Sequence, residues 1–146
     1  MQGYLGEPEK TNQVLHGGWY NTGDMAWIDG NGYIHITGRY SRFSKIGGEM
    51  IPHGGIEEEI QKVLGLLEAK LVVTGVPDPR KGERLVVLHL SIEKTPDQIV
   101  DSLRKQGLAN LWIPKSRDFY QVEEIPLLGS GKLDLKRIND LATQLA

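Results

Sequence analysis

The sequence of 146 residues contains no cysteine, which excludes disulfide bonds, thiolate metal sites and a cysteine nucleophile. No apolar run approaches the roughly 18 residues that a membrane-spanning helix needs. The first residues lack the basic and apolar regions of a signal peptide, so we expect a cytoplasmic protein without a membrane span. No two of the four histidines have the spacing of metal ligands, and we therefore expect no metal site in this chain: His16, His35, His53 and His89.

The sequence also has little excess of charge of either sign. Its net charge is −2, which indicates no nucleic-acid partner, and its 39% hydrophobic and 25% charged residues are typical of a globular protein. The charge is uneven along the chain, however. Residues 1–37 hold one basic and four acidic residues, whereas residues 38–146 are nearly balanced. We therefore predict a domain boundary near Gly38 to Ser41.

Residues 1–37 are predicted to form turns and one β-hairpin. The β-prone runs 25–29 and 33–37 flank Gly30-Asn31-Gly32, which can supply the positive φ angles of a tight turn. A single hairpin cannot bury a core of its own. We therefore interpret residues 1–37 as a β-hairpin remnant at the end of a large N-terminal domain.

Residues 38–146 are predicted to form an α+β domain, a small mixed sheet packed with about three helices. Thr95-Pro96-Asp97-Gln98 is a capping box with proline at the first helical position. Asp134 can cap the last helix. The predicted strands are 43–46, 50–51, 71–74, 85–92 and 118–122, with a turn over 77–82. The predicted helices are 54–65, with Ile56, Ile60, Val63, Leu64 and Leu67 at helical spacing, then 95–107 and a helix after Asp134.

The first motif that can carry chemistry is Gly18-Trp19-Tyr20-Asn21-Thr22-Gly23-Asp24. Its ordinary interpretation is a glycine-flanked turn that ends in a capping aspartate. Alternatively, a carboxylate fixed by such a turn can accept hydrogen bonds from the two hydroxyls of a ribose. The motif alone leaves both interpretations open.

The second motif begins at Gly38-Arg39 and continues through Lys45 and Gly47-Gly48 to Ile56-Glu57. It can be a solvated basic strand that leads into a helix. It can also be functional, because an arginine is a planar donor for a nucleotide or phosphate. Two glycines would then let a ligand or another chain approach the backbone closely.

The third motif is Pro126-Leu-Leu-Gly-Ser-Gly-Lys132, in which a lysine follows a glycine-rich loop. It is not a Walker phosphate loop, because Pro126 stands where that motif has glycine and Leu133 stands where it has serine or threonine. It can be an exposed surface loop. It can equally be a flexible arm that swings Lys132 into a site elsewhere.

In their order and spacing, the three motifs resemble those of the acyl-CoA synthetase, peptide-synthetase adenylation and luciferase superfamily, over essentially the whole chain. The segments GWYNTGD, FSKIGGEM and IPLLGSGK more narrowly resemble the synthetase part of bacterial bifunctional acyl-acyl-carrier-protein synthetase/2-acylglycerophosphoethanolamine acyltransferases. The chain would then be the mobile C-terminal lid domain (38–146) with a short tail of the N-terminal adenylation domain (1–37).

The resemblance implies a two-step reaction in phospholipid reacylation. A fatty acid and ATP with Mg²⁺ give acyl-AMP, and a thiol then takes the acyl group. The thiol belongs to the phosphopantetheine of acyl carrier protein or, alternatively, to CoA. ATP and Mg²⁺ would be held mainly by the N-terminal adenylation domain, and the full-length protein would associate with the inner membrane. This chain alone would be inactive.

The resemblance also implies roles for single residues. Asp24 and Arg39 would bind the ribose hydroxyls, with Tyr20 and Thr22 beside the nucleotide, and Lys132 would be catalytic in adenylation. Ser41 would be the hinge, and the strand with Lys45, Gly47 and Gly48 would face the active site in thioester formation. Two positions depart from the family pattern: Ser41 stands where Asp or Lys is frequent, and Met50 where some members have Arg.

An alternative from another class is a non-catalytic module that docks acyl carrier protein. Carrier proteins are acidic, and a basic face on this domain could bind one. A solvated surface of interspersed charges explains the same residues without any partner. The candidate residues of such a face are Arg42, Lys45, Arg80, Lys81, Arg84, Lys115 and Arg117.

Overall fold

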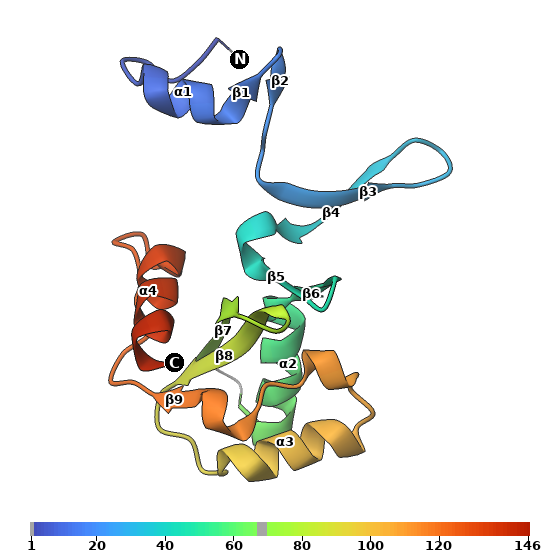
Figure 1. Ribbon diagram of the computed structural model, residues 1–146, viewed down its shortest axis with the longest axis vertical. Coiled ribbons are helices and arrows are strands. Elements are labelled where there is room, and N and C mark those ends of the chain that lie inside the picture. The colour runs from blue at the N-terminus through green and yellow to red at the C-terminus, as the bar shows by residue number, and fades with distance from the viewer. Residues whose placement is uncertain (1, 67–69) are drawn as a thin grey trace. The chain divides into compact units, whose positions relative to one another are not determined.

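The computed structural model describes residues 2–66 and 70–146, so Leu67 of the predicted first helix lies outside the described residues. The chain divides into two compact units, Met1–Tyr40 and Ser41–Ala146. Figure 1 shows their elements in chain order. This division lies within the stretch Gly38 to Ser41, where charge and composition change, and directly after strand β4, which extends to Arg39.

The first unit is built from short elements, and none of its described residues is buried. The helix α1 was not predicted, because it buries no side chain and so has no apolar periodicity to reveal it. Its start is marked only by a proline in the first turn, Pro8. The elements are α1 (Pro8–Val14), β1 (Leu15–His16), β2 (Trp19–Tyr20), β3 (Asp24–Ile28) and β4 (Ile34–Arg39).

The predicted hairpin is confirmed, since β3 and β4 pair antiparallel with a register shift between Met25 and Ala26. Its turn differs from the expectation, because only Gly32, at φ +86°, has a positive φ angle and Gly30 does not. Asp29 organises the turn instead. Its Oδ1 accepts the backbone N–H groups of Asn31 at 2.9 Å and of Tyr33 at 3.0 Å. The side chain therefore replaces part of the conformational role expected of the glycines.

The second unit has the α+β fold predicted from the sequence, with a mixed five-stranded sheet. The strand order is β6-β5-β8-β7, and β9 lies parallel to β8 while the other pairs are antiparallel. All five predicted strands are present. They are β5 (Phe43–Ile46), β6 (Glu49–Pro52), β7 (Leu71–Asp78), β8 (Gly82–His89) and β9 (Phe119–Gln121).

The β7–β8 hairpin departs from the prediction at both ends. Pro77 and Asp78 continue β7 rather than begin the turn, and β8 ends at His89, three residues before the predicted end at Ile92. Pro77 is tolerated because β7 is an edge strand and the N–H groups of its odd-numbered residues, such as Val73, point away from β8. The turn is closed by Asp78, whose Oδ1 accepts the N–H groups of Arg80 at 2.9 Å and Lys81 at 3.0 Å.

Three α-helices cover the sheet within the described part of the second unit: α2 (His53–Leu64), α3 (Pro96–Lys105) and α4 (Leu135–Leu145). Both predicted caps are confirmed, the Thr95 capping box of α3 and the Asp134 cap of α4. Alternate residues of β7 and β8 pack against α2 and α3 in one apolar cluster and against α4 in the other. Figure 1 shows α2 and α4 on opposite sides of these two strands. None of the described helices has the length and apolar character to cross a membrane.

Candidate nucleotide and acyl-transfer site

The structure distributes the predicted site residues over both units. Tyr20, Thr22, Asp24 and Arg39 belong to the first unit, and Ser41 is the first residue of the second. The second unit also carries Lys45, Gly47, Gly48 and Lys132. Ser41 is exposed and lies in a short 3₁₀ turn, Tyr40–Arg42.

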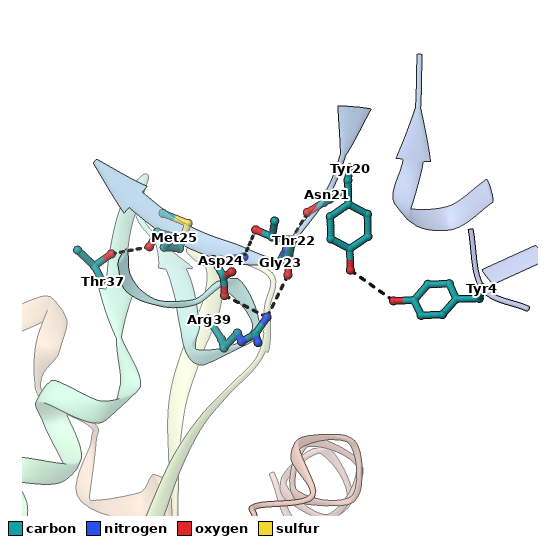
Figure 2. A network of polar contacts seen from close by, with 9 residues as sticks. All are labelled: Tyr4, Tyr20, Asn21, Thr22, Gly23, Asp24, Met25, Thr37 and Arg39. Atoms are coloured by element: carbon teal, nitrogen blue, oxygen red, sulfur yellow. Dashed lines mark hydrogen bonds and ion pairs between the residues drawn. The ribbon is translucent and has the colours of Figure 1, made fainter. Parts of the chain in front are cut away.

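Asp24 and Arg39 lie opposite each other at the open end of the β3–β4 hairpin (Figure 2). Arg39 Nη1 lies 3.0 Å from Asp24 Oδ1 and also donates to the carbonyl oxygen of Thr22 at 3.0 Å. The arginine side chain is 65% exposed and the aspartate side chain 24%. The pair thus offers a carboxylate acceptor and a guanidinium donor to a polar ligand, as the diol of a ribose would need.

Local hydrogen bonds hold Asp24 in place. Asn21 Oδ1 accepts the N–H of Gly23 at 2.9 Å, and Thr22 Oγ1 accepts the N–H of Asp24 at 3.2 Å (Figure 2). The carbonyl of Gly23 in turn accepts the N–H of Tyr40 at 2.7 Å, which closes the hairpin end. Sequence reasoning gave Asn21 no role, although an Asn two residues before a glycine is a recognised turn signal.

The Tyr20 hydroxyl lies 3.4 Å from the hydroxyl of Tyr4, a residue that sequence reasoning did not single out (Figure 2). This hydrogen bond raises the pKa of Tyr20 above its ordinary value. The Tyr20 ring is half-exposed and precedes the Asp24 turn in the chain.

In the second unit, Gly47 and Gly48 form the two-residue turn of the β5–β6 hairpin. Their φ angles are +60° and +91°, and Ile46 pairs with Glu49, which defines a type I′ turn that disfavours other residues at both positions. The N–H of Lys45 donates to Glu83 Oε2 at 2.5 Å, and the N–H of Gly47 donates to the carbonyl of Lys81 at 3.0 Å. These hydrogen bonds hold the turn in place, and the Lys45 side chain is exposed on β5, two residues before the turn.

A cavity lies beside this turn, between the β7–β8 hairpin and residues 110–118. It is lined by basic residues (Lys81, Arg104, Lys115), by acidic residues (Asp78, Glu83, Asp118) and by apolar ones such as Ile46 and Leu111. Arg84 also lines it, but its guanidinium is paired with the buried carboxylate of Asp118. Arg42, another member of the predicted basic face, is paired with Glu57. Two of the seven residues of the candidate docking face are consequently engaged within the domain itself.

Lys132 is exposed on a closed loop rather than on an open arm. Leu127 and Leu133 form a β-bridge, and the N–H of Leu128 donates to the carbonyl of Lys132 at 2.7 Å. The N–H of Asp134 donates to the carbonyl of Pro126 at 3.0 Å, which joins the loop to the start of α4. The lysine therefore stands on a loop of defined shape that is joined to α4.

Within residues 2–66 and 70–146, no three His, Asp or Glu side chains gather as they would around a metal ion. The acidic residues nearest the candidate site are engaged, Asp24 with Arg39 and Glu83 with the backbone of Lys45.

Comparison with known proteins gives consistent relatives, although no protein-family model matches the chain. A feruloyl-CoA synthase from Amycolatopsis sp is 40% identical over 136 residues, covering 91% of this chain and 27% of the relative. A long-chain-fatty-acid–CoA ligase from Bacillus subtilis (strain 168) is 32% identical over 147 residues, covering 99% of this chain and 25% of the relative. The chain therefore spans about a quarter of the length of the curated relatives it matches.

Among solved structures, ATP-bound MatB from Rhodopseudomonas palustris superposes with a TM-score of 0.76 at 28% identity, covering 99% of this chain and 28% of that one. In sequence and fold, the chain thus corresponds to the C-terminal region of adenylate-forming enzymes. More particularly, the relatives support its assignment to the AMP-forming acyl-CoA ligase superfamily.

Proposed function

We propose that this chain is the C-terminal part of an ATP-dependent acid–thiol ligase that activates a fatty acid as acyl-AMP and transfers the acyl group to a thiol. The observation that carries the proposal is the pairing of Asp24 with Arg39 at one hairpin end, held by the carbonyl of Thr22. Asp24 accepts hydrogen bonds from the ribose hydroxyls of ATP, and Arg39 donates to the ribose oxygens.

Lys132 acts in the first half-reaction. Its ammonium group contacts the fatty-acid carboxylate and the α-phosphate, and it stabilises the negative charge that develops as the acyl–phosphate bond forms and pyrophosphate leaves. The closed loop from Pro126 to Asp134 supports this role, because it presents the lysine at a defined place. Mg²⁺ and the triphosphate are held by the N-terminal adenylation domain, so this chain alone is inactive.

Residues around the Gly47-Gly48 turn act in the second half-reaction. After the domain rotates about Ser41, the turn lies beside the path of the incoming thiol, which attacks the acyl carbonyl and displaces AMP. The fixed I′ turn supports this role, because it exposes two residues without side chains next to a cavity that is lined by charges of both signs, Lys81 and Lys115 among them. Lys81 and Lys115 lie at that cavity and bind the phosphate end of a phosphopantetheine arm.

The acceptor is first proposed to be the phosphopantetheine of acyl carrier protein, with phospholipid reacylation as the purpose. Four basic residues of the predicted docking face have no ion-pair partner among the described side chains: Lys45, Arg80, Lys81 and Lys115. Arg117 lies 4.0 Å from Asp118. CoA is the second candidate, and the relatives favour it, since they are named as CoA synthases or CoA ligases.

An acceptor assay on the full-length protein tests both steps. ATP–pyrophosphate exchange that depends on a fatty acid is expected, followed by thioester formation with acyl carrier protein that exceeds the rate with CoA. Absence of fatty-acid-dependent exchange would contradict the ligase proposal. A faster reaction with CoA would leave the ligase proposal standing and replace its acceptor.

A further inference from the structure

The outer edge of β7 is covered by side chains that come from the hinge-proximal turn and from α2. The N–H of Val73 donates to Glu57 Oε1 at 2.7 Å, and the carbonyl of Val73 accepts from Arg42 Nη1 at 3.3 Å. Arg42 Nη2 lies 2.5 Å from Glu57 Oε2. Each of the three partners uses two atoms, so the contacts form a closed ring, in which the Arg42 and Glu57 side chains are only 19% and 14% exposed.

A second anchor lies two residues further along the same strand edge. Asn139 Nδ2 donates to the carbonyl of Gly75 at 2.7 Å. Asn139 belongs to α4, which begins three residues after Lys132 and is joined to the Lys132 loop by the Asp134–Pro126 hydrogen bond. One short stretch of β7 thus holds both the residue that follows Ser41 and the helix that follows the catalytic loop.

This stretch of β7 is itself firmly held. Val73 is fully buried in the core. A Cβ atom on Gly75 would lie only 2.0 Å from Ser44 Oγ, so β5 packs directly against the backbone at this glycine. Ser44 Oγ is in turn hydrogen-bonded to His53 Nε2 of α2 at 2.8 Å. Both sets of contacts are therefore made to the same firmly packed segment of β7, Val73 to Gly75.

We propose that Arg42 and Glu57 are positioning residues, which fix the residue after Ser41 to β7. Domain rotation is then absorbed at Tyr40 and Ser41, and the Lys132 loop follows as part of the same rigid body through Asn139. The inference rests on the proposed function, in which the domain takes two orientations. The inference adds that the contacts among Arg42, Glu57 and Val73, here called the clamp, confine the rotation to Tyr40 and Ser41. The clamp thereby sets both orientations of the domain.

Amide hydrogen exchange on the full-length protein tests the clamp independently of catalysis. Glu57→Gln removes the charge that holds Arg42, while Glu59→Gln on the same helix removes only an exposed pair with Lys62. Exchange over residues 41–46 is expected to rise about tenfold in Glu57→Gln and to stay unchanged in Glu59→Gln. Equal exchange in the two variants would overturn the clamp.

The half-reactions test its consequence. In Glu57→Gln, kcat of both half-reactions is expected to fall about 10- to 100-fold, with KM for ATP and fatty acid within about twofold, because misplacing a catalytic group costs rate rather than ligand binding. Arg42→Lys keeps the positive charge but lacks the planar guanidinium, and its kcat should fall less than that of Glu57→Gln. If Glu57→Gln fails to fold, hydrogen exchange and both half-reactions are measured on Arg42→Lys instead. Asn139→Leu should lower adenylation more than thioester transfer.

Wild-type rates in Glu57→Gln, or a loss confined to KM, would contradict the positioning role. If instead the wild-type protein shows no fatty-acid-dependent ATP–pyrophosphate exchange, the proposed function fails, and the hydrogen-exchange comparison still decides whether the clamp holds the hinge.

Discussion

The two units of this chain owe their structure to different physical causes. In residues 2–40 no side chain is buried, and order comes from local turns such as those of Asn21 and Asp29. In the second unit, two apolar clusters pack on opposite faces of one sheet. The second unit therefore has a core of its own, whereas the first has only the local geometry of its turns and hairpins.

The same contrast appears in the exposed apolar residues. Trp27, Ile28, Ile34 and Ile36 are between 54% and 69% exposed on the β3–β4 hairpin. A two-stranded hairpin with so much exposed apolar surface is typical of a piece that packs against a larger partner. This accords with the proposal that residues 1–37 belong to the end of an N-terminal adenylation domain.

The largest expected difference between the units is in stability. Ile56→Ala, at a fully buried residue of α2, should lower the free energy of unfolding by about 2–5 kcal/mol because it leaves a cavity. The same change at Ile36, 69% exposed on β4, should alter it by no more than about 0.5 kcal/mol. Denaturant unfolding of residues 1–146, followed by circular dichroism, measures both. A similar loss in the two variants would show that the first unit also has a stabilising core.

What the sequence could predict follows this division. The periodic apolar residues and the caps at Thr95 and Asp134 predicted all three helices of the second unit, because a core imposes periodicity on what packs against it. The helix α1 escaped prediction because nothing in it is buried. The predicted ends of the β7–β8 hairpin were wrong because strand pairing, rather than local propensity, decides where a strand stops.

Within the candidate site, motif spacing singled out Asp24, Arg39 and Lys132, and the hairpin register brings the first two together. The pairs Arg42–Glu57 and Arg84–Asp118 could not be foreseen, because their members are 15 and 34 residues apart and only the fold makes them neighbours. As a result, two arginines interpreted as free docking residues are instead part of the domain's own structure.

The next largest effect concerns catalysis by the second unit. Lys132→Ala in the full-length enzyme should lower adenylation about 100- to 1000-fold, since it removes a group that stabilises transition-state charge. Thioester transfer from supplied acyl-AMP should be nearly unchanged. Lys105→Ala, at another exposed lysine, is the matched control. Equal damage to the two half-reactions would contradict the assigned role.

A smaller effect should appear when the pH is lowered. Burial, together with the neighbouring Arg42 charge, lowers the pKa of His53 from 6.5 to about 4. The unfolded chain therefore takes up this proton first as the pH falls, so the stabilisation is complete above about pH 6.5 and is lost progressively towards pH 4. The expected loss is about 2 kcal/mol by pH 5.

Unfolding experiments between pH 7 and pH 5 measure this loss. His53→Gln should remove most of the pH dependence, although it is less stable at neutral pH. A pH dependence that survives His53→Gln would show that other groups cause it.

The smallest expected effect is ATP binding by residues 1–146 alone. Asp24 and Arg39 are the proposed nucleotide contacts of this chain, and both lie in the unit without a core. Two solvated polar contacts must offset the entropy of immobilising the ligand, and no glycine-rich loop here has the pattern that cradles a triphosphate with backbone N–H groups. We expect a Kd of about 1 mM or weaker, near −4 kcal/mol. Isothermal titration calorimetry of the chain and of Asp24→Asn measures this Kd. Because the unaltered chain already binds ATP weakly, the Kd of the variant should differ little from it.

Micromolar binding that Asp24→Asn abolishes would contradict this expectation. It would show that the first unit holds its ligand without the rest of the enzyme, and the contrast between the two units would then not extend to ligand binding.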